Sequence, residues 1–293
     1  MTVIDPTARP DIVIPAGADP AFIQDFMEIP GAFARMCKIV RFDDTVGYMT
    51  PTAAQMEVIS AIDSNRMVLV DKYRQAMITT IVLMHLLLRD CMYYRGFEGL
   101  LIANDNPTAE SAFQRLIFAY ENFEPSLRVP LATGTRGSAR SLRFIHGGGI
   151  SITSLESKAP GVGRSLARLH ITELGEVIHQ KRALMNVLPS MNRRPFAKAV
   201  IESTPGRVNT YHHETWKNAC NPHSFSEWFP VFLKWWQDET CRLRVPEGYE
   251  PTKDDKEFLR THPGADMGDA LFRRVRMESD FVGDSRLDRS KYP

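Results

Sequence analysis

The fold is decided by the stretch RMVLVDKYRQAMITT, which spans residues 66–80. Its apolar, β-branched start over 66–70 is typical of a buried strand, and the polar turn after it leads into a helix that we expect over about 79–89. A buried strand, cations, hydroxyl groups and the start of a helix are the parts of a nucleotide-phosphate site. Lys72 and Arg74 supply the cations, and Thr79 and Thr80 supply the hydroxyls. The same residues also suit an ordinary polar turn between a strand and a helix.

The alternation of strand and helix continues on both sides of this stretch. Apolar runs predict strands over 99–103, 167–172 and 197–204, and Pro107 opens a helix that we expect to reach about Phe123. Two further strand patterns, SLRFIH and ISITSL, flank three glycines at 147–149 and predict a hairpin. Residues 21–65 read as short helices. Such alternation is typical of an α/β protein with three layers, in which helices flank a mostly parallel central sheet.

Composition excludes several classes of protein. The chain has 293 residues, and 36 Lys and Arg face 35 Asp and Glu for a net charge of +1, which excludes a globally basic coat for nucleic acid. The four cysteines form no CxxC pair, so we expect no disulfide framework. The longest apolar run, 81–88, falls short of the roughly 20 residues that span a bilayer. Because the N-terminus carries acids and prolines in place of an export signal, we expect no export and no membrane partner.

Three more segments carry residues suited to phosphoryl chemistry. Glu173 follows the predicted strand at 167–172, and a carboxylate at a strand tip can orient an attacking water. The hydroxyl residues of STP, residues 203–205, follow another predicted strand and can sense a γ-phosphate. Arg164 ends the glycine loop GVGR and suits an arginine finger. Taken singly, these residues also fit a capping acid, a common turn and a solvated arginine.

The order of these segments resembles the ATPase module of the large subunit of tailed-phage terminases, the motors that package DNA into proheads. The resemblance covers about Phe33 to Trp236. It implies a three-layer P-loop NTPase fold of the additional-strand type that binds ATP and Mg²⁺ and translocates double-stranded DNA. It also implies a homo-oligomeric ring on the portal of the prohead, a small terminase subunit as a partner, and localisation to the host cytoplasm.

The resemblance assigns a role to each candidate residue. Glu173 matches the catalytic carboxylate, and Arg164 would complete the site of a neighbouring subunit. Thr79 would ligate Mg²⁺, with Thr172 acting on the ion through a bound water. The residues that match the nucleotide-binding positions are Gln55 for adenine and Lys72, Arg74, Gln75, Thr79 and Thr80 for the phosphates. The residues that match the coupling motif are Ser203, Thr204 and Pro205.

Two positions depart from the family pattern. The glycine of the phosphate loop is Met77, and because a side chain makes positive φ costly, we expect the loop to use ordinary backbone angles. The acid that often precedes the catalytic glutamate is Thr172, which lacks a charge to hold Mg²⁺. These departures motivate a second hypothesis, a catalytically decayed nucleotide-binding scaffold of the packaging complex. A third hypothesis is a helicase-like, DNA-dependent ATPase.

The sequence predicts three regions. We expect an extended N-terminal arm over 1–32, an ATPase domain over 33–236 and a charged peripheral or linker segment over 237–293. Large terminase subunits continue into an RNase H-like nuclease domain, so we expect that domain to be truncated or encoded as a separate chain, and we assign no nuclease residues. His212, His213, Cys220 and His223 suggest a metal, but a helix over 209–219 is the preferred interpretation. Arg193 and Arg194 are candidates for contact with DNA phosphates.

Overall fold

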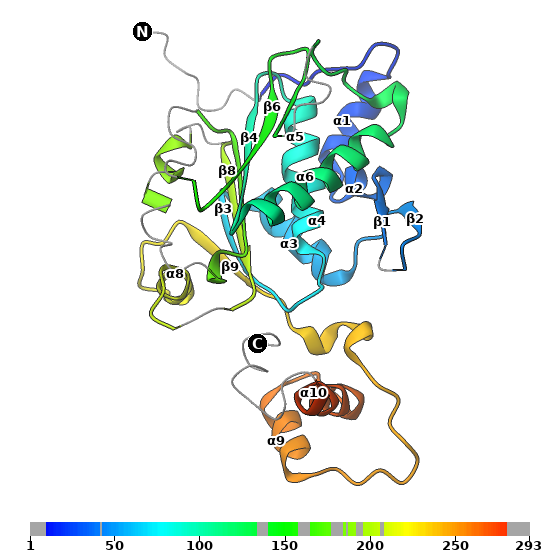
Figure 1. Cartoon of the computed structure of the whole chain (residues 1–293), viewed down its shortest axis with the longest axis vertical. Helices are drawn as coiled ribbons and strands as arrows, with labels where there is room; N and C mark the ends of the chain where they lie inside the picture. The colour runs from blue at the N-terminus through cyan, green and yellow to red at the C-terminus, as the bar shows by residue number, and fades with distance from the viewer. Residues whose placement is uncertain are drawn as a thin grey trace.

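A seven-stranded sheet forms the centre of the protein (Figure 1). The computed structural model describes residues 10–41, 43–133, 140–157, 165–176, 184–185, 187–191, 196–205 and 208–279. The strand order is β5-β6-β4-β7-β8-β3-β9, and all neighbours are parallel except β5 and β6. The strands are β3 (Met67–Asp71), β4 (Glu98–Ala103), β5 (Ser141–Arg143), β6 (Gly149–Ser154), β7 (Arg168–Thr172), β8 (Lys198–Ser203) and β9 (Trp228–Phe232). The predicted α/β class and the hairpin at 147–149 are confirmed.

Both faces of the sheet are buried, which explains why its strands read as continuous apolar runs. Side chains alternate between the faces, so Val68 and Leu101 join the core under one layer of helices, while Leu69 and Ile102 join a separate core on the other face. Figure 1 shows α3, α4, α5 and α6 along the first face and α8 (Tyr211–Cys220) on the second. The three predicted layers are therefore present.

The helix that follows β3 is longer and less regular than expected. It consists of α4 (Ile78–Val82), the π-helix η1 (Leu83–Leu88) and α5 (Arg89–Tyr93), which follow one another without a break. The other helices on this face are α1 (Pro20–Glu28), α2 (Ala32–Met36), α3 (Ala53–Ser64) and α6 (Asn106–Glu121). As predicted, α6 begins near Pro107, and the side chain of Asp105 caps it by accepting a hydrogen bond from the Thr108 amide.

Two features near the ends of the chain were not predicted. Residues Lys38–Val40 and Val46–Tyr48 form an antiparallel hairpin, β1–β2, outside the main sheet. The segment after residue 237 contains α9 (Lys253–Thr261) and α10 (Met267–Ser279), and the rings of Phe258 and Phe272 pack on Trp235. Short 3-10 turns complete the fold: η2 (Pro125–Leu127), η3 (Leu174–Glu176), η4 (Leu188–Ser190), η5 (Trp235–Gln237) and η6 (Glu239–Cys241). Within the described ranges, every helix is too short or too polar to cross a bilayer.

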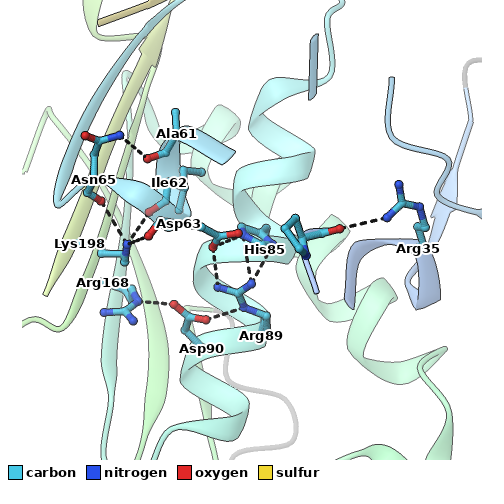
Figure 2. Close-up of polar contacts among 11 residues, drawn as sticks. Arg35, Ala61, Ile62, Asp63, Asn65, His85, Arg89, Asp90, Arg168 and Lys198 are labelled. Carbon is cyan, nitrogen blue, oxygen red and sulfur yellow. Dashed lines mark hydrogen bonds and ion pairs between the residues drawn. The ribbon is translucent and has the colours of Figure 1, made fainter. Parts of the chain in front are cut away.

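A buried network of charges ties the helices to the amino ends of β7 and β8 (Figure 2). Asp90 lies between two guanidinium groups, with 2.7 Å to Arg89 Nε and 2.5 Å to Arg168 Nε. His85 of the π-helix extends the network, because its Nε2 lies 2.8 Å from Asp63 Oδ1 at the end of α3. Burial alone would raise the pKa of Asp90, but the two arginines outweigh it and lower that pKa to about 2.

Lys198, the first residue of β8, closes the carboxyl end of α3 (Figure 2). Its ammonium donates hydrogen bonds to the carbonyls of Ile62, Asp63 and Asn65 at 2.5, 2.9 and 3.2 Å. These contacts satisfy carbonyl groups that a helix end leaves unpaired. Burial lowers the pKa of Lys198 to about 8.

The Asp90 network predicts a large effect from a small change. Replacing Asp90 by Asn leaves the buried guanidinium of Arg168 without its counter-charge and leaves Arg89 only the more distant Asp63, so we expect the free energy of unfolding to fall by about 3–5 kcal/mol. Urea denaturation measures this loss. Because the pKa of Asp90 is lowered on folding, its stabilisation is lost as pH falls, and the gap between wild type and Asp90→Asn should shrink from pH 4 toward pH 2.

The control is Glu110→Gln, which breaks the ion pair of Glu110 with Arg140. Both of those side chains are more than half exposed, so we expect a loss of about 1 kcal/mol or less. An Asp90→Asn protein as stable as this control would contradict the assigned role of the buried network.

Candidate active site

The carboxyl ends of β3, β7 and β8 meet at one edge of the sheet and bring the predicted site residues together. The strands are neighbours and parallel, so the segments that follow them start side by side. Lys72 N donates to the Ser203 carbonyl at 3.0 Å, and Glu173 N donates to the Glu202 carbonyl at 2.9 Å. Backbone hydrogen bonds thus hold two segments against β8: the turn after β7 and the start of the predicted phosphate loop, residues 72–77.

The ammonium group of Lys72 is the centre of this edge. It lies 2.7 Å from Glu173 Oε1 and 3.0 Å from Glu202 Oε2, and the Lys72 side chain is 7% exposed. Burial alone would lower the pKa of Lys72, but the attraction of Glu202 and Glu173 outweighs it and raises that pKa. Lys72 is therefore a charged group held between two carboxylates, Glu202 in β8 and Glu173 in the turn after β7.

Glu202 is the main site residue that sequence analysis missed. It is fully buried, its Oε1 accepts a hydrogen bond from Thr79 Oγ1 at 2.7 Å, and His170 Nε2 lies 3.3 Å from the same oxygen. Burial opposes its ionisation, but Lys72 and the hydrogen bonds of His170 and Thr172 lower the pKa of Glu202. The sequence did hold a signal: a glutamate inside the apolar run KAVIES is costly to bury unless it is paired.

A cavity of about 470 Å³ opens beside these charges. Its volume lies within the range of small-molecule sites, roughly 300–1,000 Å³. It is lined by Lys72, Arg74, Gln75, Asn104, Thr108, Glu173 and Thr204. Five of these, Lys72, Arg74, Gln75, Glu173 and Thr204, are predicted site residues. Asn104, from the turn after β4, and Thr108, from the first turn of α6, are additions.

The prediction that the phosphate loop uses ordinary backbone angles is wrong. Gln75 has φ 66° and Met77 has φ 52°, so both residues adopt the left-handed conformation. Met77 precedes α4 directly, at the position where the family pattern has glycine. The loop thus keeps a glycine-type backbone without glycine, at a conformational cost of about 1–2 kcal/mol for each residue.

The predicted coupling residues reach the turn that carries Glu173. Ser203 Oγ accepts a hydrogen bond from Gly175 N at 2.9 Å, and Thr204 Oγ1 donates to Glu173 Oε2 at 3.4 Å. Pro205 follows and is half-buried. The tip of β8 is therefore in direct contact with the acid at the tip of β7.

Gln55 and Thr80 do not line this cavity. Gln55 Nε2 donates to the Ala76 carbonyl at 3.0 Å, and its Oε1 accepts from Thr52 N at 3.1 Å in a capping box of α3. Thr80 is buried and accepts from Arg115 Nη1 at 3.1 Å. The structure gives Gln55 a role in shaping the loop, and adenine recognition by its amide stays a prediction.

The sequence also proposed three further arginines and a group of metal-ligand residues. Arg164, Arg193 and Arg194 lie outside the described residues. His212 Nε2 lies 3.1 Å from Asp71 Oδ1 and so links α8 to the end of β3. Among the residues that the structure describes, no group of three or more His, Cys, Asp and Glu side chains is placed to hold a metal ion.

The sheet order and the flanking helices define a three-layer α/β fold with a mostly parallel central sheet. More particularly, it is the fold of the ATPase domains of phage large terminases. The large terminase ATPase domain of Thermus phage P74-26 matches with a TM-score of 0.58 and 13% identity over 83% of this chain and 92% of that chain. The large terminase of bacteriophage HK97 matches with a TM-score of 0.63 and 14% identity over 91% of this chain.

Other comparisons set the limits of this likeness. The match covers 54% of the HK97 protein, so this chain spans about half of that terminase. A large terminase from a thermophilic bacteriophage matches with a TM-score of 0.51 and 8% identity over 74% of this chain and 51% of that chain. No protein-family model and no curated protein matches the sequence.

The left-handed residues of the loop predict opposite effects for two neighbouring substitutions. Gln75 and Arg74 are both exposed, but only Gln75 has positive φ. Gln75→Gly removes the energetic cost of positive φ, and this gain exceeds the cost of the conformational entropy that glycine loses on folding. The free energy of unfolding should therefore rise by about 0.5–1 kcal/mol. Arg74→Gly brings only the entropic cost of glycine and should lower the free energy of unfolding by about 0.5–1 kcal/mol. Chemical denaturation checks both, and an equal loss in the two variants would contradict the left-handed loop.

Proposed function

We propose that this protein hydrolyses ATP to drive double-stranded DNA into a phage prohead, as the ATPase part of a large terminase. The observation that carries the proposal is the contact of 2.7 Å between Lys72 Nζ and Glu173 Oε1 beside the cavity. Phosphoryl transfer needs a cation on the phosphates and an acid that positions water within a few ångströms of each other. The terminase-type fold supports the same proposal.

Each residue at this edge would act by position and charge. Lys72 and Arg74 would bind the β- and γ-phosphates, and Gln75 and Thr80 would support the loop around them. Glu173 would orient and polarise the attacking water once Lys72 exchanges its carboxylate for phosphate oxygens. Arg164 of a neighbouring subunit would neutralise the charge that develops during transfer.

The residues present fit a magnesium ion. Mg²⁺ prefers hard oxygen ligands, and the hydroxyl groups of Thr79 and Thr172 lie 3.4 Å apart at the edge of the loop. We propose that Thr79 holds the ion and that Thr172 hydrogen-bonds one of its waters. When bound with ATP, the ion would neutralise charge on the phosphate oxygens.

Coupling to DNA would begin at the tip of β8. Thr204 contacts Glu173, and Ser203 contacts Gly175, so a change at the γ-phosphate would reach β8 directly. We propose that Ser203, Thr204 and Pro205 pass this change to the elements that move DNA. The working assembly would be a homo-oligomeric ring on the portal in the host cytoplasm, with a small terminase subunit. Its grip on DNA phosphates would be salt-sensitive and independent of sequence.

The proposal predicts distinct losses at Glu173 and Lys72. Glu173→Gln removes the group that polarises water but keeps the shape of the site, so turnover should fall at least about 100-fold while the affinity for ATP changes little. Lys72→Ala should lower both turnover and affinity. Glu214→Gln, on the exposed side of α8, is the matched control and should behave as wild type. Turnover in Glu173→Gln at the wild-type rate would contradict the assignment.

Two observations favour the scaffold hypothesis. Lys72 is already neutralised by two carboxylates, and Thr172 brings no charge for a metal. ATP binding without turnover in the wild-type protein would support a scaffold. Comparing turnover with duplex and single-stranded DNA separates the packaging motor, which duplex DNA should stimulate, from a helicase-like ATPase.

A further inference from the structure

Threonine at position 172 leaves the tip of β7 without the acid that would hold a metal ion. The neighbouring strand supplies one. Thr172 of β7 and Glu202 of β8 are paired in register, so their side chains start side by side. Parallel neighbours lie about 4.8 Å apart. Glu202 Oε1 lies 2.7 Å from Thr79 Oγ1, which in turn lies 3.4 Å from Thr172 Oγ1, so the carboxylate is close to both hydroxyl groups.

We propose that Glu202, from β8, is the carboxylate that binds the magnesium ion of this site in place of the missing acid on β7. The inference rests on the proposed function, since it concerns the ion that accompanies ATP. It adds a charge to the set formed by the hydroxyl groups of Thr79 and Thr172.

The surroundings of Glu202 favour a metal-binding role. Glu202 is fully buried, yet its carboxylate is turned toward the phosphate loop, where it contacts Thr79 and Lys72. His170 Nε2 lies 3.3 Å from Oε1, the same oxygen that accepts from Thr79, and helps to hold the carboxylate. Carboxylates that ligate metal ions are commonly held by hydrogen bonds of their own.

Lys72 compensates the charge of Glu202 before a ligand binds. Its ammonium lies 3.0 Å from Glu202 Oε2 and balances the charge that Mg²⁺ would otherwise balance. A divalent cation at Glu202 would compete with Lys72 for that carboxylate, and the ammonium would then be available to the phosphates. Metal binding and phosphate binding would therefore favour each other.

A carboxylate swap tests the proposal. The variants are Glu202→Gln, which removes the charge, and Glu202→Gln combined with Thr172→Asp, which returns a charge to β7. Equilibrium titration with a fluorescent, non-hydrolysable ATP analogue is run in Mg²⁺ and in EDTA, and Mn²⁺ binding in the presence of the analogue is followed by electron paramagnetic resonance. Thermal unfolding monitors the fold of each variant, and Glu214→Gln is the control.

The expected results differ between variants. Wild type and Glu214→Gln should bind the analogue more tightly in Mg²⁺ than in EDTA. Glu202→Gln should lose about tenfold or more of the affinity in Mg²⁺ and bind Mn²⁺ correspondingly more weakly, with a smaller change in EDTA. The double variant should recover most of the Mg²⁺-dependent affinity. A purely structural role for Glu202 would lower affinity equally in Mg²⁺ and EDTA, and Asp at 172 would not restore it.

The failure of the inference and of the proposed function are distinguishable. Mg²⁺-dependent binding that is equal in wild type and Glu202→Gln overturns the inference alone, whereas no binding of the analogue by wild type under either condition overturns the proposed function. Should Glu202→Gln not fold, the Glu173→Gln protein is labelled with ¹³C-carboxyl glutamate. A ¹³C coupling to bound Mn²⁺ then supports Glu202 as the ligand, and the absence of this coupling overturns the proposal.

Discussion

The candidate site depends on one buried ammonium group, that of Lys72, which is held between the carboxylates of Glu173 and Glu202. A charge in such a place is costly unless counter-charges lie within a few ångströms. Here the sheet supplies them, because the loop after β3 and the tips of β7 and β8 meet at one edge. The strand order therefore brings together three charges that lie as far as 130 residues apart along the chain.

Backbone strain gathers at the same edge. Five non-glycine residues of the described ranges have positive φ, and three of them, Gln75, Met77 and Glu173, lie here. Each such conformation costs about 1–2 kcal/mol and persists only where the surroundings fix it. The surroundings do so here: Gln55 bonds to the carbonyl between Gln75 and Met77, and Glu173 N bonds to β8. Strain concentrated around one cavity is what a preorganised site requires, and it supports a functional role for this edge over an ordinary turn.

The sequence predicted the strands well because strands buried on both faces carry an unbroken apolar signal. It located Lys72, Glu173 and Thr204 at strand tips for the same reason. It missed the β1–β2 hairpin, whose three-residue strands carry too little pattern, and it missed the backbone of Met77 because the hydrogen bond from Gln55 that supports the loop is a tertiary contact. The role of Glu202 could not be predicted for a related reason: its partners are identified only once β3, β7 and β8 are placed side by side.

The two buried charge networks lie at opposite ends of the same pair of strands. Arg168 and Lys198 are paired in register at the amino ends of β7 and β8, and Thr172 and Glu202 are paired at the carboxyl ends. Because side chains alternate between faces, a slip of one residue would turn Glu202 away from Thr79 and Lys72. Apolar side chains alone specify register weakly between two strands that are buried on both faces, since either face accepts them. The ion pair of Arg168 with Asp90 and the hydrogen bonds of Lys198 to carbonyls at the end of α3 add specificity, so the network at the amino ends helps to place the charges of the site.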